Sequence, residues 1–295
     1  MAPFHIAGSA SSRPGFFRFG APLCYGTLAE GQPADSPAGK LFDASATVRA
    51  SAGNISLPFD PTEAAENLRR ERYVATGDSE RQLRKLYYSV RPLLPLQVRT
   101  ALQRLVVRRR RSAVFPAWPV DDSVDQIFES MMQLAISAAG GHEVPFIWFW
   151  PEGRQSALIV THDVEEAQGA AHCETLMDID ESFGVPAAFQ VIPESRYGGV
   201  EQLVSRLRAR GFEANLHDLD HDGRLYEDRQ LFNRRAGKIN AYARQYGMHG
   251  FRAGAMHRNQ EWFDALEFDY DMSVPTVSHL EPQKGGCCTV MPYFI

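Results

Sequence analysis

Apolar and polar residues follow a regular alternation in the second half of this 295-residue chain. From residue 146 onward, short apolar runs alternate with longer stretches that have the 3.6-residue spacing of amphipathic helices. The apolar runs predict strands at 157–160, 186–192, 212–216, 249–252, 268–273 and 288–291. The longer stretches predict helices at 166–183, 200–210, 226–246 and 261–266. Strands that alternate with helices indicate βα units and a mostly parallel sheet or barrel, so the predicted fold class is α/β.

Residues 1–145 have a less regular pattern. A Gly-, Pro- and Ser-rich arm precedes short apolar-aromatic pieces at 23–25 and 55–59, which predict a small β meander or hairpin. Predicted helices follow at 60–73, 79–90, 96–111 and 121–139. The first of them begins at a capping Asp60 followed by Pro61. We therefore expect an irregular, mostly helical accessory region at 1–145 and an α/β domain at 146–295.

The composition of the chain argues against several classes of protein. The chain is 44% hydrophobic and 23% charged, which is typical of a soluble globular protein. Its net charge of -5 provides no basic field that would favour nucleic acid. No apolar stretch reaches 18 residues, and the N-terminus lacks the pattern of a secretory signal. We therefore expect no transmembrane span and a cytoplasmic location. The four cysteines have no CxxC spacing, which indicates neither a disulfide framework nor a cysteine zinc site.

One run of positive charge stands out at Arg108–Arg111, with Arg99 and Arg104 before it. Such a run is most often a solvated helix face. The alternative is a patch that binds an anionic partner, such as a lipid, a glycan or an acidic protein. The sequence leaves both interpretations open.

Three polar clusters follow predicted strands: Thr161–Glu165, His217–His221 and Gly250–Ala255. In parallel βα folds the functional site lies at the carboxyl ends of the strands, where loops from different strands converge. We therefore expect the three clusters to meet at one edge of the sheet.

The spacing of His217 and His221 is typical of a metal site. Imidazoles four residues apart can reach one ion. A carboxylate from the cluster at 161–165 would complete a set of two histidines and one carboxylate, which leaves coordination positions open for water. A metal of this kind lowers the pKa of its water to roughly 7 and polarises a carbonyl. A second carboxylate nearby could then accept the proton of that water.

A calcium interpretation competes for the same segment. The pattern Asp218-x-Asp220-x-Asp222-Gly223 resembles the start of an EF loop. The twelfth position is Arg229 instead of a bidentate Glu, and the preceding residues predict a strand instead of a helix. Zinc at the histidine pair is therefore favoured over calcium.

Taken in order, the clusters at 161–165, 217–221 and 252–255 resemble the motifs of the polysaccharide deacetylases, the NodB homology domain of carbohydrate esterase family 4. The resemblance extends over about residues 145–295 and includes the strand at 268–273. It implies a distorted (β/α) barrel. The chain ends on a strand before the family's last strand and its general-acid histidine, so the barrel is expected to be incomplete at its C-terminus.

The resemblance implies a ligand set for a divalent metal, most often zinc. His217 and His221 would be two of the ligands. Val164 stands where the commonest family motif has a ligating Asp, so Glu165 would be the third ligand.

The resemblance also implies catalytic roles. Asp163 would be the general base, oriented by a bidentate ion pair with Arg252, although Asp163 could instead be a metal ligand. The backbone N–H near Ala255 would help to hold an oxyanion. His162 is expected to have a packing or supporting role.

The implied activity is that of a metal-dependent carbohydrate deacetylase, a hydrolase that removes N-acetyl groups from an amino-sugar polymer or glycan. The alternative is a non-catalytic carbohydrate-binding or scaffold protein on a deacetylase-like fold. It is favoured by Val164, and by Gly254–Ala255 where the family often has Pro-Tyr.

Overall fold

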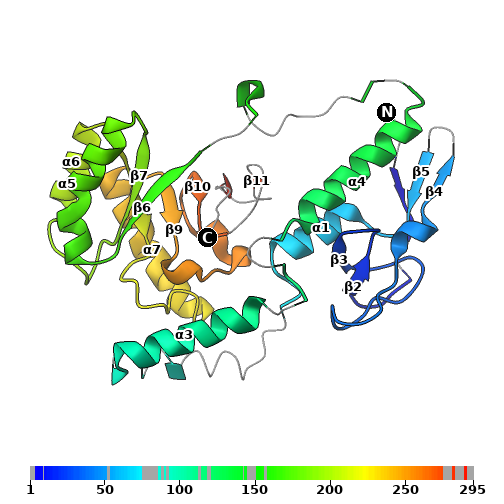
Figure 1. Ribbon diagram of the computed structural model, residues 1–295, viewed down its shortest axis with the longest axis horizontal. Helices are drawn as coiled ribbons and strands as arrows, with labels where there is room; N and C mark the ends of the chain where they lie inside the picture. The colour runs from blue at the N-terminus through cyan, green and yellow to red at the C-terminus, as the bar shows by residue number, and fades with distance from the viewer. Residues whose placement is uncertain are drawn as a thin grey trace. The chain divides into compact units, whose positions relative to one another are not determined.

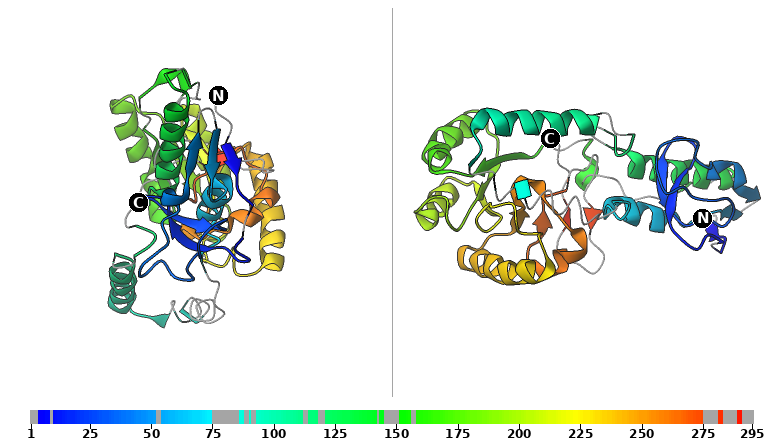
Figure 2. Two further views of the ribbon diagram at one scale, coloured as in Figure 1. Left: turned by 90° about the vertical axis from the view of Figure 1, so that its right-hand side faces the viewer. Right: turned by 90° about the horizontal axis from the view of Figure 1, so that it is seen from below.

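The computed structural model describes residues 4–8, 10–51, 54–74, 86–87, 90, 93–111, 114–117, 121–141, 143–144, 151–155, 158–274, 281–282 and 289–290. The chain forms two compact units (Figure 1). The first comprises Met1–Asp78 and Leu93–Trp148, and the second comprises Ser79–Pro92 and Phe149–Ile295. Figure 2 shows the units from two further directions. The predicted helix at 79–90 lies almost entirely outside the described residues.

The described residues of the first unit form two small sheets. The strands β1 (Phe4–Ile6), β5 (Asn54–Leu57) and β4 (Arg49–Ser51) form one sheet, with β1 parallel and β4 antiparallel to the central β5. The strands β2 (Gly15–Arg18) and β3 (Leu23–Gly26) form an antiparallel pair. The strands predicted at 23–25 and 55–59 are therefore both present, but they belong to different sheets.

The helices described in this unit are η1 (Ala44–Thr47), α1 (Pro61–Arg69), α3 (Leu96–Arg111) and α4 (Ser123–Ala138). The N-terminus of α1 is as predicted, because the Asp60 carboxylate accepts hydrogen bonds from the backbone N–H groups of Thr62 and Glu63. The helix ends earlier than predicted, and Glu71 already has a left-handed φ of 54°.

The core of the first unit lies where α1 and α4 pack against the hairpin and its neighbouring loops. Phe17, Phe59 and Ile127 are almost completely buried in this cluster. The neighbouring Phe128 of α4 is 38% exposed and lies outside this cluster. The basic run is helical as predicted, and Arg104 and Arg108 are exposed on α3.

The second unit is built on a mostly parallel sheet. Its strands within the described residues have the order β11-β12-β10-β9-β8-β7-β6, and only β11 is antiparallel to its neighbour. The strands are β6 (Val160–Val164), β7 (Ala187–Val191), β8 (Glu213–His217), β9 (Gly250–Arg252), β10 (Tyr270–Asp271), β11 (Glu281–Pro282) and β12 (Thr289–Val290). The α/β class predicted from the alternating pattern is confirmed.

Each of the first three strands is followed by a long helix. These helices are α5 (Ala167–Ser182), α6 (Val200–Ala209) and α7 (Arg229–Tyr246). Shorter turns are η3 (Pro151–Gly153), η4 (Gly254–Met256) and η5 (Gln260–Ala265). No helix in the described part of the chain has the length and apolarity needed to cross a membrane.

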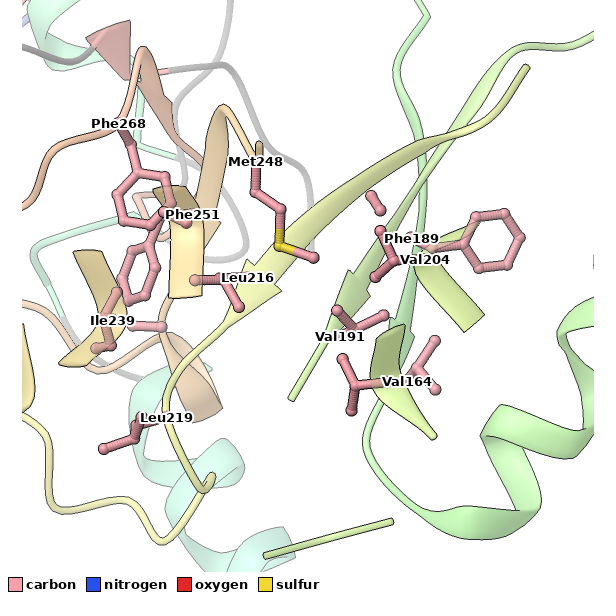
Figure 3. Close-up of a cluster of buried hydrophobic side chains, with 14 of the residues drawn as sticks. Val164, Phe189, Val191, Val204, Leu216, Leu219, Ile239, Met248, Phe251 and Phe268 are labelled. Atoms are coloured by element: carbon pink, nitrogen blue, oxygen red, sulfur yellow. The ribbon is translucent and has the colours of Figure 1, made fainter. Parts of the chain in front are cut away.

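One face of this sheet is apolar and packs against the helices. Alternate strand residues point to that face. Val164, Phe189, Val191, Leu216 and Phe251 are all at most 2% exposed there (Figure 3). Buried residues of α5, α6 and α7 complete the same cluster. The opposite face of the strands is therefore left for polar side chains.

The first predicted strand is displaced. Residues 157–160 were predicted as a buried strand with the polar cluster after it, but β6 begins only at Val160. Leu158 is 83% exposed and Ile159 is 37% exposed, so the apolar run does not enter the core. The ladder with β7 instead includes His162, Asp163 and the buried Val164. Most of the first polar cluster therefore belongs to the strand itself.

Candidate metal centre

The sheet register brings the predicted residues to one edge. Val164 pairs with Val191, and Val191 pairs with Leu216. Glu165 directly follows β6, His217 is the last residue of β8, and His217 pairs directly with Arg252 of β9. These residues therefore lie at the same level at the carboxyl ends of three parallel strands, where βα folds place their sites. Because strand side chains alternate, Asp163 shares the face of Glu165.

Glu165, His217 and His221 form a compact group of metal-ligating atoms. One donor atom from each residue lies within 4.8 Å of the other two. The Glu165 Oε1 atom is 3.3 Å from His221 Nε2 and 3.6 Å from His217 Nε2. Two ligand atoms at tetrahedral angles around one zinc ion lie about 3.4 Å apart, since each is about 2.1 Å from the metal. The spacing of these donors fits such an ion.

Hydrogen bonding orients His217 for this role. The residue is 1% exposed, and its Nδ1 lies 3.1 Å from the backbone carbonyl oxygen of Arg252. A carbonyl only accepts, so Nδ1 carries the proton and Nε2 presents its lone pair. Within the described residues, the Nε2 atoms of His217 and His221 are buried without a hydrogen-bond partner. Buried polar atoms of this kind are rare, and a metal ion would satisfy both.

The second histidine stands on a constrained loop. His221 and Asp218 both have a left-handed φ, of 52° and 62° respectively. Gly254 of the third cluster approaches this loop so closely that a Cβ atom there would lie 2.8 Å from His221 Cδ2 and 2.7 Å from Asp218 Oδ2. Only glycine fits this contact. The sequence interpretation treated Gly254 as a departure from the family pattern and missed this requirement.

Ala255 follows directly after that glycine. It is exposed, lies in η4 and has a φ of 53°. The backbone N–H that was predicted to hold an oxyanion therefore belongs to a segment that packs against the loop of His221. The role itself stays a prediction.

Asp163 lies beside the ligand group and is held by Arg252. The Arg252 Nη1 donates to Asp163 Oδ1 at 2.7 Å, and Nη2 donates to Thr161 Oγ1 at 3.0 Å. The predicted bidentate pair is therefore wrong, because the two ends of the guanidinium fork hold two different residues of β6. The second carboxylate oxygen, Oδ2, is 3.8 Å from His217 Nε2. One oxygen of Asp163 is thus fixed, while the other lies close to the ligand group.

The charges within the group support one another. The interaction with His217, and next that with His221, holds the pKa of the Glu165 carboxyl well below its usual range. Burial disfavours the charged form of the His221 ring, but Glu165 outweighs it and raises the pKa of His221. Without an ion, the Glu165 carboxylate favours the charged form of the His221 imidazole. A bound cation would replace that interaction.

Two neighbouring residues have structural roles. His162 points to the opposite face of the sheet, where its Nε2 is 2.7 Å from Asp180 Oδ2 of α5. The Tyr197 hydroxyl accepts a hydrogen bond from Ile192 N and donates one to the carbonyl oxygen of Val164, both at 2.9 Å. It thereby joins the ends of β6 and β7 one residue before Glu165. Tyr197 stands in no motif, so no local signal in the sequence could have identified this contact.

No family model matches the chain, and no curated protein matches it. Solved structures with a similar chain path include a candidate polysaccharide deacetylase from Mycobacterium smegmatis, with 19% identity, a TM-score of 0.41 and coverage of 49% of this chain and 60% of that one.

The Xyl-CE4 domain of a multidomain xylanase from the hindgut metagenome of Trinervitermes trinervoides has 17% identity and a TM-score of 0.32, with 39% and 55% coverage. The catalytic domain of a peptidoglycan N-acetylglucosamine deacetylase from Eubacterium rectale ATCC 33656 has 17% identity and a TM-score of 0.28, with 36% and 50% coverage. A likeness of this extent concerns the fold alone, and this chain spans between half and three-fifths of their lengths.

Proposed function

We propose that this chain is a metal-dependent hydrolase that removes N-acetyl groups from an amino-sugar polymer or glycan. One observation carries the proposal: Glu165, His217 and His221 converge beside an Asp163 carboxylate that Arg252 holds in place. Two imidazoles and one carboxylate form a set that leaves positions for water and substrate. The motif resemblance to the polysaccharide deacetylases supports the substrate class.

The ion proposed at this site is zinc. Imidazole nitrogen and carboxylate oxygen are ligands that zinc accepts, and the donor separations of 3.3 and 3.6 Å suit its tetrahedral geometry. When bound there, zinc would lower the pKa of a water molecule and polarise the acetamide carbonyl.

Asp163 has the geometry of a general base. Its Oδ1 is fixed by Arg252, so its Oδ2 stays directed toward the ligand group and can accept a proton from the attacking water. The Glu165 Oε1 atom lies near both imidazoles, at 3.6 Å from His217 Nε2 and 3.3 Å from His221 Nε2, which favours Glu165 as the ligand. The N–H of Ala255 would hold the negative charge that develops on the carbonyl oxygen.

A metal analysis combined with an assay for acetate tests this proposal. The purified chain is expected to contain about one equivalent of zinc and to release acetate from chito-oligomers or N-acetylated peptidoglycan. His217→Ala should lose both the metal and the activity. Asp163→Asn should keep the metal, while kcat falls by about 10²- to 10⁴-fold because the proton acceptor is lost.

His172→Ala is the matched control, since His172 is exposed on α5 away from these contacts. It should leave metal content and activity unchanged. A wild-type chain with no stoichiometric zinc, cobalt or nickel would overturn the metal site. Stoichiometric metal without any acetate release from these substrates would overturn the hydrolase and favour the non-catalytic carbohydrate-binding alternative.

A further inference from the structure

Three aspartates crowd the loop that carries His221. Asp218, Asp220 and Asp222 occupy alternate positions between β8 and α7, the arrangement that made calcium a competing interpretation. Neighbouring carboxylates of like charge repel one another, and a cation between them offsets that repulsion. A positive charge beside the loop would therefore stabilise it.

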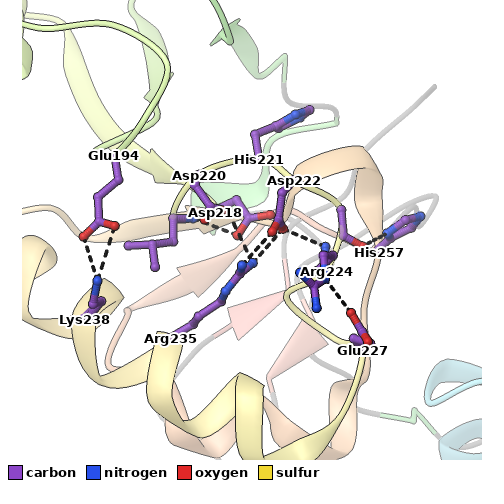
Figure 4. A network of polar contacts seen from close by, with 12 residues as sticks. Glu194, Asp218, Asp220, His221, Asp222, Arg224, Glu227, Arg235, Lys238 and His257 are labelled. Atoms are coloured by element: carbon purple, nitrogen blue, oxygen red, sulfur yellow. Dashed lines mark hydrogen bonds and ion pairs between the residues drawn. The ribbon is translucent and has the colours of Figure 1, made fainter. Parts of the chain in front are cut away.

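Arg235 of α7 supplies that charge (Figure 4). Its Nη1 and Nη2 donate to the two carboxylate oxygens of Asp222 at 2.7 and 2.6 Å, and Nη1 is 3.3 Å from Asp220 Oδ1. The side chain is only 12% exposed. The bidentate pair with Asp222 raises the pKa of the Arg235 guanidinium further above its ordinary value. A permanent cation from the protein thus lies among the carboxylates that would otherwise attract calcium.

Arg196, from the connection between β7 and α6, holds the backbone of the same loop. Its Nε donates to the carbonyl oxygen of Asp220 at 3.1 Å, and its Nη2 donates to that of His221 at 2.6 Å. Arg196 thus holds the backbone carbonyl groups of Asp220 and His221. Arg235 contacts the side chains of Asp220 and Asp222, on either side of His221. The loop is held from two separate elements.

The backbone conformation shows what these contacts must hold. A left-handed φ is unfavourable at a residue other than glycine and persists only where the surroundings enforce it. His221 has this conformation, with a φ of 52°, and it places Nε2 at 3.3 Å from Glu165 Oε1. A relaxed His221 would turn its ring away from Glu165 and His217.

We propose that Arg235, together with Arg196, is a positioning residue that replaces a structural cation in this loop and holds His221 in its metal-binding conformation. The inference rests on the proposed function, because it takes the Glu165, His217 and His221 group as the metal site. It predicts that metal affinity depends on a residue that does not touch the metal. Supporting residues of this kind typically change metal affinity by roughly 10- to 100-fold when they are removed.

Titration of the metal-free 295-residue chain with Co²⁺, followed by visible absorption, tests the proposal. Arg235→Ala should weaken Co²⁺ binding by roughly 10- to 100-fold and change the absorption band, because one imidazole is displaced. Added guanidinium chloride at low millimolar concentration should restore both properties by filling the vacated position. Arg235→Lys should bind with intermediate affinity, since it keeps the charge but loses the planar fork.

Arg234→Ala is the control, because Arg234 is the exposed neighbour on the same helix. Circular dichroism checks the fold of each variant, and Arg235→Lys serves as the test if the alanine variant does not fold. Unchanged Co²⁺ affinity and spectrum in a folded Arg235 variant would overturn the inference and leave the proposed function intact. A wild-type chain that binds no Co²⁺ would overturn the proposed function, and this inference with it.

Discussion

Arg252 connects the ligands to the proposed base through two different groups. Its backbone carbonyl accepts the hydrogen bond from His217 Nδ1 and thereby selects the tautomer that can bind a metal. Its side chain holds Asp163 and Thr161 on β6. A substitution of the side chain leaves the carbonyl in place, so the two roles can be separated by experiment.

Arg252→Lys should retain zinc but lose most of its activity. Lysine cannot reach Asp163 and Thr161 together, so the carboxylate loses its fixed orientation, and a misplacement of about 1 Å can cost about 100-fold in rate. Zinc content and kcat for acetate release measure the two effects. Arg244→Lys, at an exposed position of α7, is the control. If Arg252→Lys loses zinc in proportion to activity, the separation of roles is wrong.

Among the elements, α7 has the clearest link between a local signal and the site. The helix begins where the Asp228 side chain accepts a hydrogen bond from Leu231 N at 2.8 Å, and it ends at Gly247 with a φ of 58°. The sequence pattern predicted this end correctly but placed the start at Tyr226. The start of α7 matters for the site, because Arg235 lies in the second turn of this helix and contacts the loop of His221 from there.

Asp228→Ala should reduce the free energy of unfolding by about 1 kcal/mol, the usual cost of a lost N-cap. Asp228→Asn should retain most of the stability, because the amide oxygen can accept the same hydrogen bond. Urea unfolding followed by circular dichroism measures both variants. Equal stability of the alanine and asparagine variants would show that the cap contributes nothing.

On the scale of the whole second unit, the sheet separates an apolar face from a face that carries the site. Asp271 is a carboxyl group on the apolar side, where it pairs with Phe251. Its carboxyl is 1% exposed and accepts hydrogen bonds from the backbone N–H and the hydroxyl of Ser273. Burial outweighs these bonds and raises the pKa of Asp271 to about 7. The folded chain therefore holds this proton at pH values where the unfolded chain has released it.

Asp271 should make the folded state less stable as the pH rises. Between the ordinary pKa near 4 and the folded value of about 7, the folded state binds one more proton than the unfolded state, so this contribution to stability falls with rising pH. The difference in unfolding free energy between wild type and Asp271→Asn should change by up to about 1.4 kcal/mol per pH unit in this range. Asp264→Asn, at an exposed position, should show no such slope. A flat difference for Asp271→Asn would contradict the prediction.

Local patterns were sufficient for the parts of the molecule that depend on local physics. Strand and helix periodicity predicted the α/β class and the end of α7, and the Asp60 cap predicted the start of α1, because these signals act within a few residues. The clusters at 161–165 and 217–221 were identified because histidines four residues apart and carboxylates after strands are typical of metal sites. Their juxtaposition follows from the parallel order of the strands.

Contacts between distant segments required the tertiary structure. Only the register shows that Asp163 lies within β6 and shares a face with Glu165, because a short apolar run such as 157–160 does not reveal which residues will pair. Arg235 and Gly254 have no local signature, since their roles arise from contacts with a loop elsewhere in the chain. The sequence by itself determined which residues could bind a metal, and the tertiary structure decided which of them meet and what holds them there.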